Sequence, residues 1–177
     1  MKIIYTKKFS LDNMKIGHFT LFQGQGFYSR NIKAKQLKAG FTKDQARFTH
    51  IEVCCGGQNS LTVMPFQPIH IIDIREKHKG KFIRVVKYKG KEYNRKRYKV
   101  ALWAVSKSNL RYDIFGIISF LLKFIKQNTK KFFCSELALY ALQKEYPEAL
   151  DSLEPDQCMP AHFTTEELDV VWEGYIT

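Results

Sequence analysis

The sequence predicts an α+β domain in which a mostly antiparallel sheet packs against two central helices. Short apolar segments whose side chains alternate between two faces recur through the first part of the chain, and turn residues separate them. Two longer apolar segments follow, each of a length that suits a helix. With 177 residues, 45% of them apolar, the chain is long enough for one domain with a buried core, which excludes disordered proteins.

The N-terminal part predicts a strand, a turn and a basic helix. Residues 17–22 have the composition of a short strand. Gly24 and Gly26 then mark a tight turn, because glycine adopts backbone conformations that other residues avoid. We expect a short basic helix over residues 27–37, with Ser29 as its N-cap.

A β-hairpin follows. Residues 48–55 alternate as a strand, residues 56–59 (Gly-Gly-Gln-Asn) form the turn, and residues 60–66 return as the second strand. Pro65 and Pro68 mark the end of that strand or an edge of the sheet, because proline lacks the N–H that a central strand donates.

The second half of the chain predicts three further strands and two helices. Residues 82–88 and 98–105 have strand composition and are joined by a lysine-rich turn. One helix is expected over residues 113–126, with an aspartate at its N-cap, and another over residues 135–145, after which a proline follows. Residues 170–176 are expected to form the last strand.

Charge is unevenly distributed along the chain. The 29 Lys and Arg residues exceed the 17 Asp and Glu residues, so the net charge is +12. Residues 1–131 carry +21 and residues 132–177 carry −9. Because opposite charges attract, we expect the acidic end, including a tail from about residue 147, to lie on the basic body of a single domain that comprises residues 1–177.

The basic stretch over residues 75–99 has twelve cations with aromatic residues between them. Such a pattern suits single-stranded nucleic acid. A solvated hairpin with alternating faces also explains this pattern, and we favour that interpretation. Anionic membrane head groups and cell-wall polymers are further candidates for an anionic partner.

No targeting segment is expected. Residues 1–10 are polar and basic, without the apolar centre of a secretory signal. The longest apolar run, Ile114–Ile125, is too short to cross a bilayer, so we expect a buried core helix, with an interfacial membrane helix as the alternative. A cytoplasmic protein with reduced thiols is the corresponding prediction.

The cysteine and glycine patterns predict neither a metal site nor a cofactor. The four cysteines include the adjacent Cys54 and Cys55, and no pair has the spacing of a zinc ligand set. Gly24 and Gly26 lack the third glycine of a dinucleotide-binding turn, and the Lys-Ser/Thr of a phosphate-binding loop is absent.

Cys134 is the principal candidate for chemistry, because it stands where a short apolar segment becomes a helix. The helix dipole and the unpaired N–H groups of the first turn favour a thiolate there, and the same N–H groups can stabilise an oxyanion. The alternative is a small, buried and unreactive side chain.

His50 is the candidate base for this thiol, since a strand histidine facing a helix-start cysteine is the papain-type pairing. Glu52 shares the strand face of His50. Because the two positions stand about 6.5 Å apart along the backbone, Glu52 reaches the imidazole only by leaning back.

Three segments together resemble the YiiX/YebB-like branch of the NlpC-type cysteine hydrolases, whose papain fold is circularly permuted. The histidine strand precedes the cysteine helix, as in the permuted order. The resemblance covers roughly residues 15–145, and the Cys-Ser-Glu-Leu element is its most specific part. The matching segments are Gly17-His18-Phe19-Thr20-Leu21-Phe22 with Tyr28-Ser29-Arg30-Asn31-Ile32, then Phe48-Thr49-His50-Ile51-Glu52-Val53, and then Tyr112-Asp113 with Phe132-Phe133-Cys134-Ser135-Glu136-Leu137.

The resemblance implies that Cys134 is the nucleophile and that His50 is the general base and then the general acid. Two positions depart from the family pattern. Gly17-His18 stands where the family often has Gly-Asp, and Met64 stands where it often has a glutamate. Methionine cannot orient an imidazole, so Glu52 is the expected third catalytic group.

Three further residues are candidates for the substrate-binding cleft. Thr62, on the strand after His50, is also a weaker candidate for the group that orients the imidazole. Tyr112 lines the cleft in the family pattern, with a packed aromatic as the alternative. Glu136 is in the first turn of the cysteine helix, where capping is the stronger interpretation.

These residues predict a thiol hydrolase or acyl-transfer enzyme without a cofactor, acting on a peptide, another amide or an acyl-lipid. The alternative is a catalytically silent papain-like module that binds a polyanion such as nucleic acid or an anionic membrane. The substitution at Met64 is the best support for that alternative.

Overall fold

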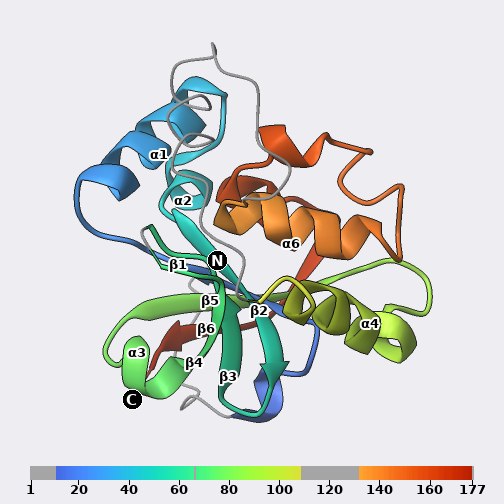
Figure 1. The fold of residues 1–177 in the computed structure, drawn as a ribbon. Coiled ribbons are helices and arrows are strands. Elements are labelled where there is room, and N and C mark those ends of the chain that lie inside the picture. The colour runs from blue at the N-terminus through green and yellow to red at the C-terminus, as the bar shows by residue number, and fades with distance from the viewer. Residues whose placement is uncertain (1–10, 66, 109–131, 177) are drawn as a thin grey trace.

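The computed structural model describes residues 11–65, 67–108 and 132–176. Six strands form one sheet in the order β4-β3-β2-β1-β5-β6, and every neighbouring pair is antiparallel (Figure 1). The expected α+β class is therefore confirmed. The strands are β1 (Phe19–Phe22), β2 (His50–Gly56), β3 (Asn59–Thr62), β4 (His70–Asp73), β5 (Phe82–Tyr88) and β6 (Leu168–Tyr175). The helices are α1 (Phe27–Lys38), α2 (Lys43–Ala46), α3 (Ile74–Lys77), α4 (Tyr93–Val105) and α6 (Cys134–Gln143), with short 3-10 helices at Leu11–Asn13, Pro155–Gln157 and Pro160–Thr164.

The central strands bury both of their faces. Phe19 and Leu21 belong to the larger core, which includes the buried side of α6. Helix α6 packs on β2, with α4 beside it (Figure 1). On the opposite face, Phe22, Ile83 and Trp172 belong to a second, smaller core. Burial on both faces explains why β1 is apolar at nearly every position.

Local contacts define where α6 begins. Phe133, its N-cap, has an extended backbone, and its N–H donates to the carboxylate of Glu136 at 3.2 Å. This contact satisfies one backbone donor at the helix start. Eight of the ten residues of α6 are buried, which matches its central place between the sheet and α4.

The strand predicted over residues 98–105 is wrong, because these residues form the second half of α4. The buried residues of this helix, Tyr93, Val100, Ala101 and Ala104, recur at helical spacing and so share one face. The prediction began at Tyr98 and missed the start of that pattern. The favoured hairpin over residues 75–99 is wrong for the same reason, since only its first strand, β5, exists.

Smaller differences concern the ends of elements. The N-cap of α1 is Gly26 and not Ser29, and its φ of 96° is one that favours glycine. The hairpin of β2 and β3 is confirmed, but β3 ends at Thr62, before the prolines. The last strand is confirmed as β6.

The helix expected over residues 113–126, which contains Ile114–Ile125, lies outside the described residues. None of the helices in the described ranges has the length and apolar character needed to cross a bilayer.

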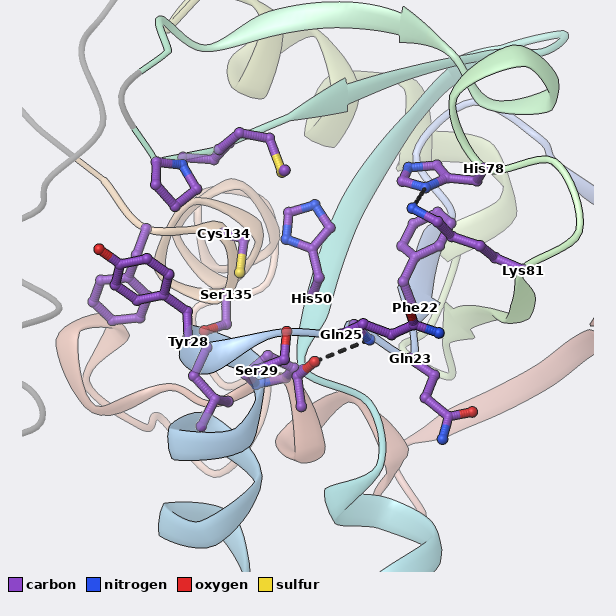
Figure 2. Close-up of a pocket in the computed structure, with 18 residues that line it drawn as sticks. Phe22, Gln23, Gln25, Tyr28, Ser29, His50, His78, Lys81, Cys134 and Ser135 are labelled. Carbon is purple, nitrogen blue, oxygen red and sulfur yellow. Dashed lines mark hydrogen bonds between the residues drawn. The ribbon is translucent and has the colours of Figure 1, made fainter.

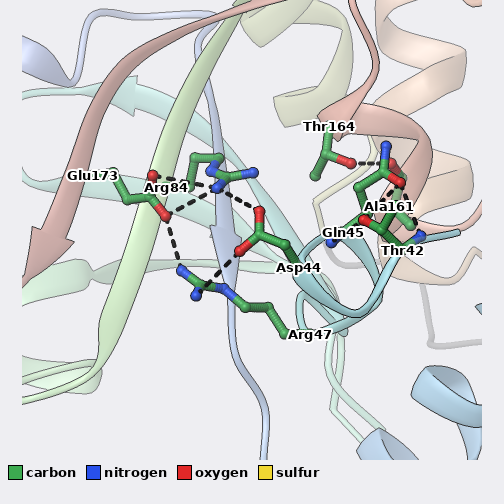
Figure 3. A network of polar contacts seen from close by, with 8 residues as sticks. All are labelled: Thr42, Asp44, Gln45, Arg47, Arg84, Ala161, Thr164 and Glu173. Atoms are coloured by element: carbon green, nitrogen blue, oxygen red, sulfur yellow. Dashed lines mark hydrogen bonds and ion pairs between the residues drawn. The ribbon is translucent and has the colours of Figure 1, made fainter. Parts of the chain in front are cut away.

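Strand β6 brings the acidic end of the chain onto the basic body, as the charge distribution predicts. Glu173 on β6 accepts hydrogen bonds from Arg47 Nη2 at 2.8 Å and from Arg84 Nη2 at 3.0 Å (Figure 3). Asp44 of α2 pairs with the same two guanidinium groups at 3.3 and 3.0 Å. The network ties α2 to β5 and β6, so the acidic end is part of the sheet.

Replacing Glu173 by Gln is expected to lower the free energy of unfolding by about 2 kcal/mol, because two guanidinium groups lose a shared anionic acceptor in a largely buried place. Urea denaturation measures this change. Asp169→Asn is the matched control, since its carboxylate is 47% exposed and stands 3.7 and 3.8 Å from two lysines. Asp169→Asn is expected to lower the free energy of unfolding by less than about 0.5 kcal/mol. Equal decreases in the two variants would contradict a stabilising role for the network around Glu173.

Candidate active site

Cys134 lines a cavity of about 240 Å³ between the sheet and the start of α6. The thiol is the first side chain of the helix and is 8% exposed. Other walls come from the end of β1, the start of α1 and the segment after β3, as Figure 2 shows. The cavity therefore gives a small molecule or an extended side chain access to an otherwise buried sulfur.

His50, the first residue of β2, lies beside Cys134 in this cavity (Figure 2). Its Nε2 is 3.3 Å from Glu52 Oε1 and 3.1 Å from Thr62 Oγ1. An ionised carboxylate only accepts hydrogen bonds, so Nε2 carries a proton and donates it to Glu52. The other ring nitrogen, Nδ1, is left for the Cys134 thiol.

The Glu52 side chain bends back along β2 to reach the imidazole. It is 1% exposed, and it shares a strand face with His50, as the alternation of β2 predicts. The structure thus brings together the three residues expected to be catalytic. Thr62 does not line the cavity; its hydroxyl contacts Nε2 of His50, which fits its second expected role, that of orienting the imidazole, better than substrate binding.

His78 is a member of this cluster that the sequence analysis missed. It follows α3 directly, is 4% exposed, and donates from Nε2 to the same oxygen of Glu52 at 2.9 Å. Its ring packs against Phe22 with 3.9 Å between centroids. One signal could have found it: Ile74 and His78 are four residues apart, so a helical turn places both on the buried side.

The electrostatics of the cluster favour an imidazolium next to a carboxylate. Burial by itself would lower the pKa of His50, but the charge and hydrogen bond of Cys134, and then those of Glu52, raise it to about 10. Burial would raise the pKa of Glu52, but the hydrogen bonds from His50 and His78 lower it to about 2. Both groups are therefore charged at neutral pH.

The other three cysteines have the character of unreactive thiols. Burial raises the pKa of Cys54 to about 12 and that of Cys55 to about 11. Burial also raises the pKa of Cys158 well above its usual value. None of the three lines the cavity, and all four cysteines are free thiols.

Several groups near Cys134 have assigned partners. The Ser135 hydroxyl donates to the carbonyl of Cys158 at 2.7 Å, which fixes the first turn of α6. Glu136 is 4% exposed, caps that turn and does not line the cavity, so its role toward substrate stays a prediction. Tyr112 lies outside the described residues.

Donors suited to an oxyanion line the cavity. The first N–H groups of a helix have no acceptor within the helix, and those of Cys134 and Ser135 stand next to the thiol at the cavity wall. The amide side chains of Gln23 and Gln25 line the same cavity. A carbonyl oxygen bound over Cys134 would thus meet donors at the helix start.

The thiol of Cys134 and the imidazole of His50 supply a nucleophile and a base at the cavity wall. Within the described parts of the chain, no three His, Cys, Asp or Glu side chains are arranged to hold a metal ion. No protein-family model matches this chain, and no curated protein sequence matches it either.

Cys134 is expected to react with iodoacetamide at pH 7 roughly 100-fold faster than Cys54, Cys55 or Cys158, because it lines the cavity beside the imidazole of His50, whereas burial raises the pKa of the other three thiols and keeps them protonated. Peptide mapping of alkylated protein over time measures the four rates. His50→Ala is expected to abolish the advantage, and a rate for Cys134 no higher than that for Cys55 would contradict an activated thiol.

Proposed function

We propose that the protein is a cysteine hydrolase or acyltransferase that acts through a covalent acyl-enzyme. One observation carries the proposal: Cys134, at the start of a buried helix, lies beside a histidine whose far nitrogen donates to a buried carboxylate. A thiol, a base and a group that orients the base are the parts of nucleophilic acyl transfer.

In the first half of the reaction, the Cys134 thiolate attacks the carbonyl carbon of a bound ester or amide, and the oxygen becomes an oxyanion facing the helix N–H groups. The carbon–sulfur bond forms, and the bond to the leaving group breaks. The imidazolium of His50 gives its Nδ1 proton to the departing oxygen or nitrogen. A thioester on Cys134 and a neutral His50 remain.

In the second half, water or another acceptor attacks the thioester. His50 Nδ1 takes the proton of the attacking hydroxyl or amine, and the thiolate leaves. The acyl group is released as an acid or transferred product, and the thiolate–imidazolium pair is restored. Glu52 keeps the Nε2 proton in place throughout, which leaves Nδ1 free to exchange the catalytic proton.

The arrangement is compatible with a circularly permuted papain-like fold, which we include in the proposal. The strand that begins with His50 precedes α6 in the chain and contacts it in space. The antiparallel sheet against which the cysteine helix packs supports the same assignment.

The cavity favours an apolar acyl group or side chain. Most of its walls are hydrophobic, which suits an aliphatic or aromatic substrate group. The apolar residues that line the cavity include Phe22, Ile32, Val63, Met64, Phe133 and Pro160. A lipid acyl chain and an apolar peptide side chain both meet this description.

The second candidate function is a silent module that binds a polyanion, supported by the net charge of +12 and by Met64. The position of Glu52 weakens this candidate, because the orienting carboxylate missing at Met64 is supplied from β2. A silent module would bind anionic vesicles or single-stranded DNA with an affinity that falls steeply with salt. That binding would survive Cys134→Ala.

Hydrolysis of p-nitrophenyl esters and anilides of increasing acyl length tests the enzyme. Cys134→Ala is expected to remove activity to background, and His50→Ala to lower kcat/KM about 10²–10⁴-fold, because the nucleophile and its proton donor are lost. Cys55→Ala is the control and is expected to keep full activity. Equal rates in the wild type and in Cys134→Ala would refute the proposed function.

A further inference from the structure

We infer that His78 is a positioning residue of the proposed reaction, one that holds the Glu52 carboxylate in place and ionised so that Glu52 can orient His50 toward Cys134. The inference rests on the proposed function, and it adds to Cys134, His50 and Glu52 a residue that does not touch the substrate's reacting atoms.

The contact between His78 and Glu52 is closer than the one between His50 and Glu52. The two imidazoles reach the same oxygen, Oε1, at 2.9 and 3.3 Å respectively. His78 is 4% exposed and is packed on Phe22 with a 31° angle between the rings, so its orientation is fixed by packing as well as by the hydrogen bond. His78 reaches Glu52 from the C-terminal end of α3, whereas His50 reaches it from β2, the strand that carries Glu52.

Lys81 determines which nitrogen of His78 carries the proton. Its Nζ lies 3.3 Å from His78 Nδ1, and an ammonium group can only donate. Nδ1 therefore accepts, and the proton of a neutral His78 sits on Nε2, facing Glu52. The titratable groups in contact with His78 are thus Lys81 on one side and Glu52 of β2 on the other, and His50 shares Glu52 with it.

Glu52 requires a second donor because of where it lies. The side chain is 1% exposed, and its other oxygen, Oε2, has no hydrogen-bond partner among the described residues. Burial by itself would raise the pKa of this carboxyl, and the two histidines are what lower it. Without His78, the carboxylate would keep its contact with His50 and lose its closest donor.

The Glu52 carboxylate fixes which nitrogen of His50 faces Cys134. Its Oε1 accepts the Nε2 proton of His50, so Nδ1 is the nitrogen left to exchange the catalytic proton with the thiol or an attacking water. His78 therefore acts on the reaction through Glu52, by holding in place the oxygen that accepts the Nε2 proton.

Two substitutions separate positioning from packing. His78→Leu fills the space but removes the donor, whereas His78→Gln retains an N–H near the position of Nε2. The ¹³C resonance of the Glu52 carboxyl is followed against pH, over the range in which tryptophan fluorescence shows a folded protein. Glu52 is expected to titrate about 1–2 pH units higher in His78→Leu, and close to the wild-type value in His78→Gln.

The alkylation rate of Cys134 is expected to depend on the same contact. At pH 7 this rate should fall about tenfold in His78→Leu, because a Glu52 that is held less firmly orients His50 less well, and it should stay within about twofold of the wild type in His78→Gln. His18→Leu removes another buried histidine, one bonded to the Asn13 carbonyl and away from the cavity, and should change neither readout.

The inference is overturned if Glu52 titrates at the same pH in His78→Leu as in the wild type, or if His78→Gln shifts it as far as His78→Leu does. A different result would count against the proposed function alone. If Glu52 shifts as expected but wild-type Cys134 reacts no faster than Cys55, the hold of His78 on Glu52 stands and the acyl-transfer chemistry does not.

Discussion

The buried carboxylate of Glu52 is the constraint on which the rest of the site depends. A carboxylate that is 1% exposed is costly unless donors surround it, and here two imidazoles converge on one of its oxygens. One imidazole comes from the same strand and the other from the end of α3. Their convergence requires β1 and β3 to flank β2, because Phe22 supports the ring of His78 and Thr62 contacts the ring of His50. The sheet order therefore places the residues that support both imidazoles beside β2.

The nucleophile is placed by different forces. Cys134 owes its position to the cap between Phe133 and Glu136 and to the burial of α6 in the larger core, and neither involves the polar cluster. The thiol and the base thus belong to different elements, α6 and β2, which pack on each other and meet at the wall of one cavity. In such an arrangement the core fixes the separation of the reacting groups, while the hydrogen bonds of Glu52 fix the direction in which His50 points. Rigid placement of both is what pre-organised catalysis requires.

The parts of this architecture that could be predicted are those encoded over short distances. The alternation of β2 puts His50 and Glu52 on one face, and the Cys-Ser-Glu-Leu segment marks a helix start, so these residues follow from the sequence alone. The prediction failed at residues 98–105, where a strand-like composition conceals a helical spacing that begins at Tyr93. It also failed at His78: the spacing from Ile74 predicts that His78 is buried, but its contact with Glu52, 26 positions away, depends on how α3 docks, which no local pattern encodes.

Met64 stands where the pattern that the sequence resembles often has a glutamate. In this structure the carboxylate that contacts His50 is that of Glu52. An orienting carboxylate on the neighbouring strand would face the histidine directly, whereas Glu52, on the histidine's own strand, must bend back along β2. The buried Glu52 carboxylate needs a hydrogen-bond donor besides His50, and Nε2 of His78 supplies it. Position 64 then needs no carboxylate, and the methionine side chain there forms part of the apolar cavity wall. In the proposed enzyme, moving the carboxylate to β2 thus couples two properties: the orientation of the base comes to depend on a second histidine, and the cavity becomes better suited to an apolar acyl group.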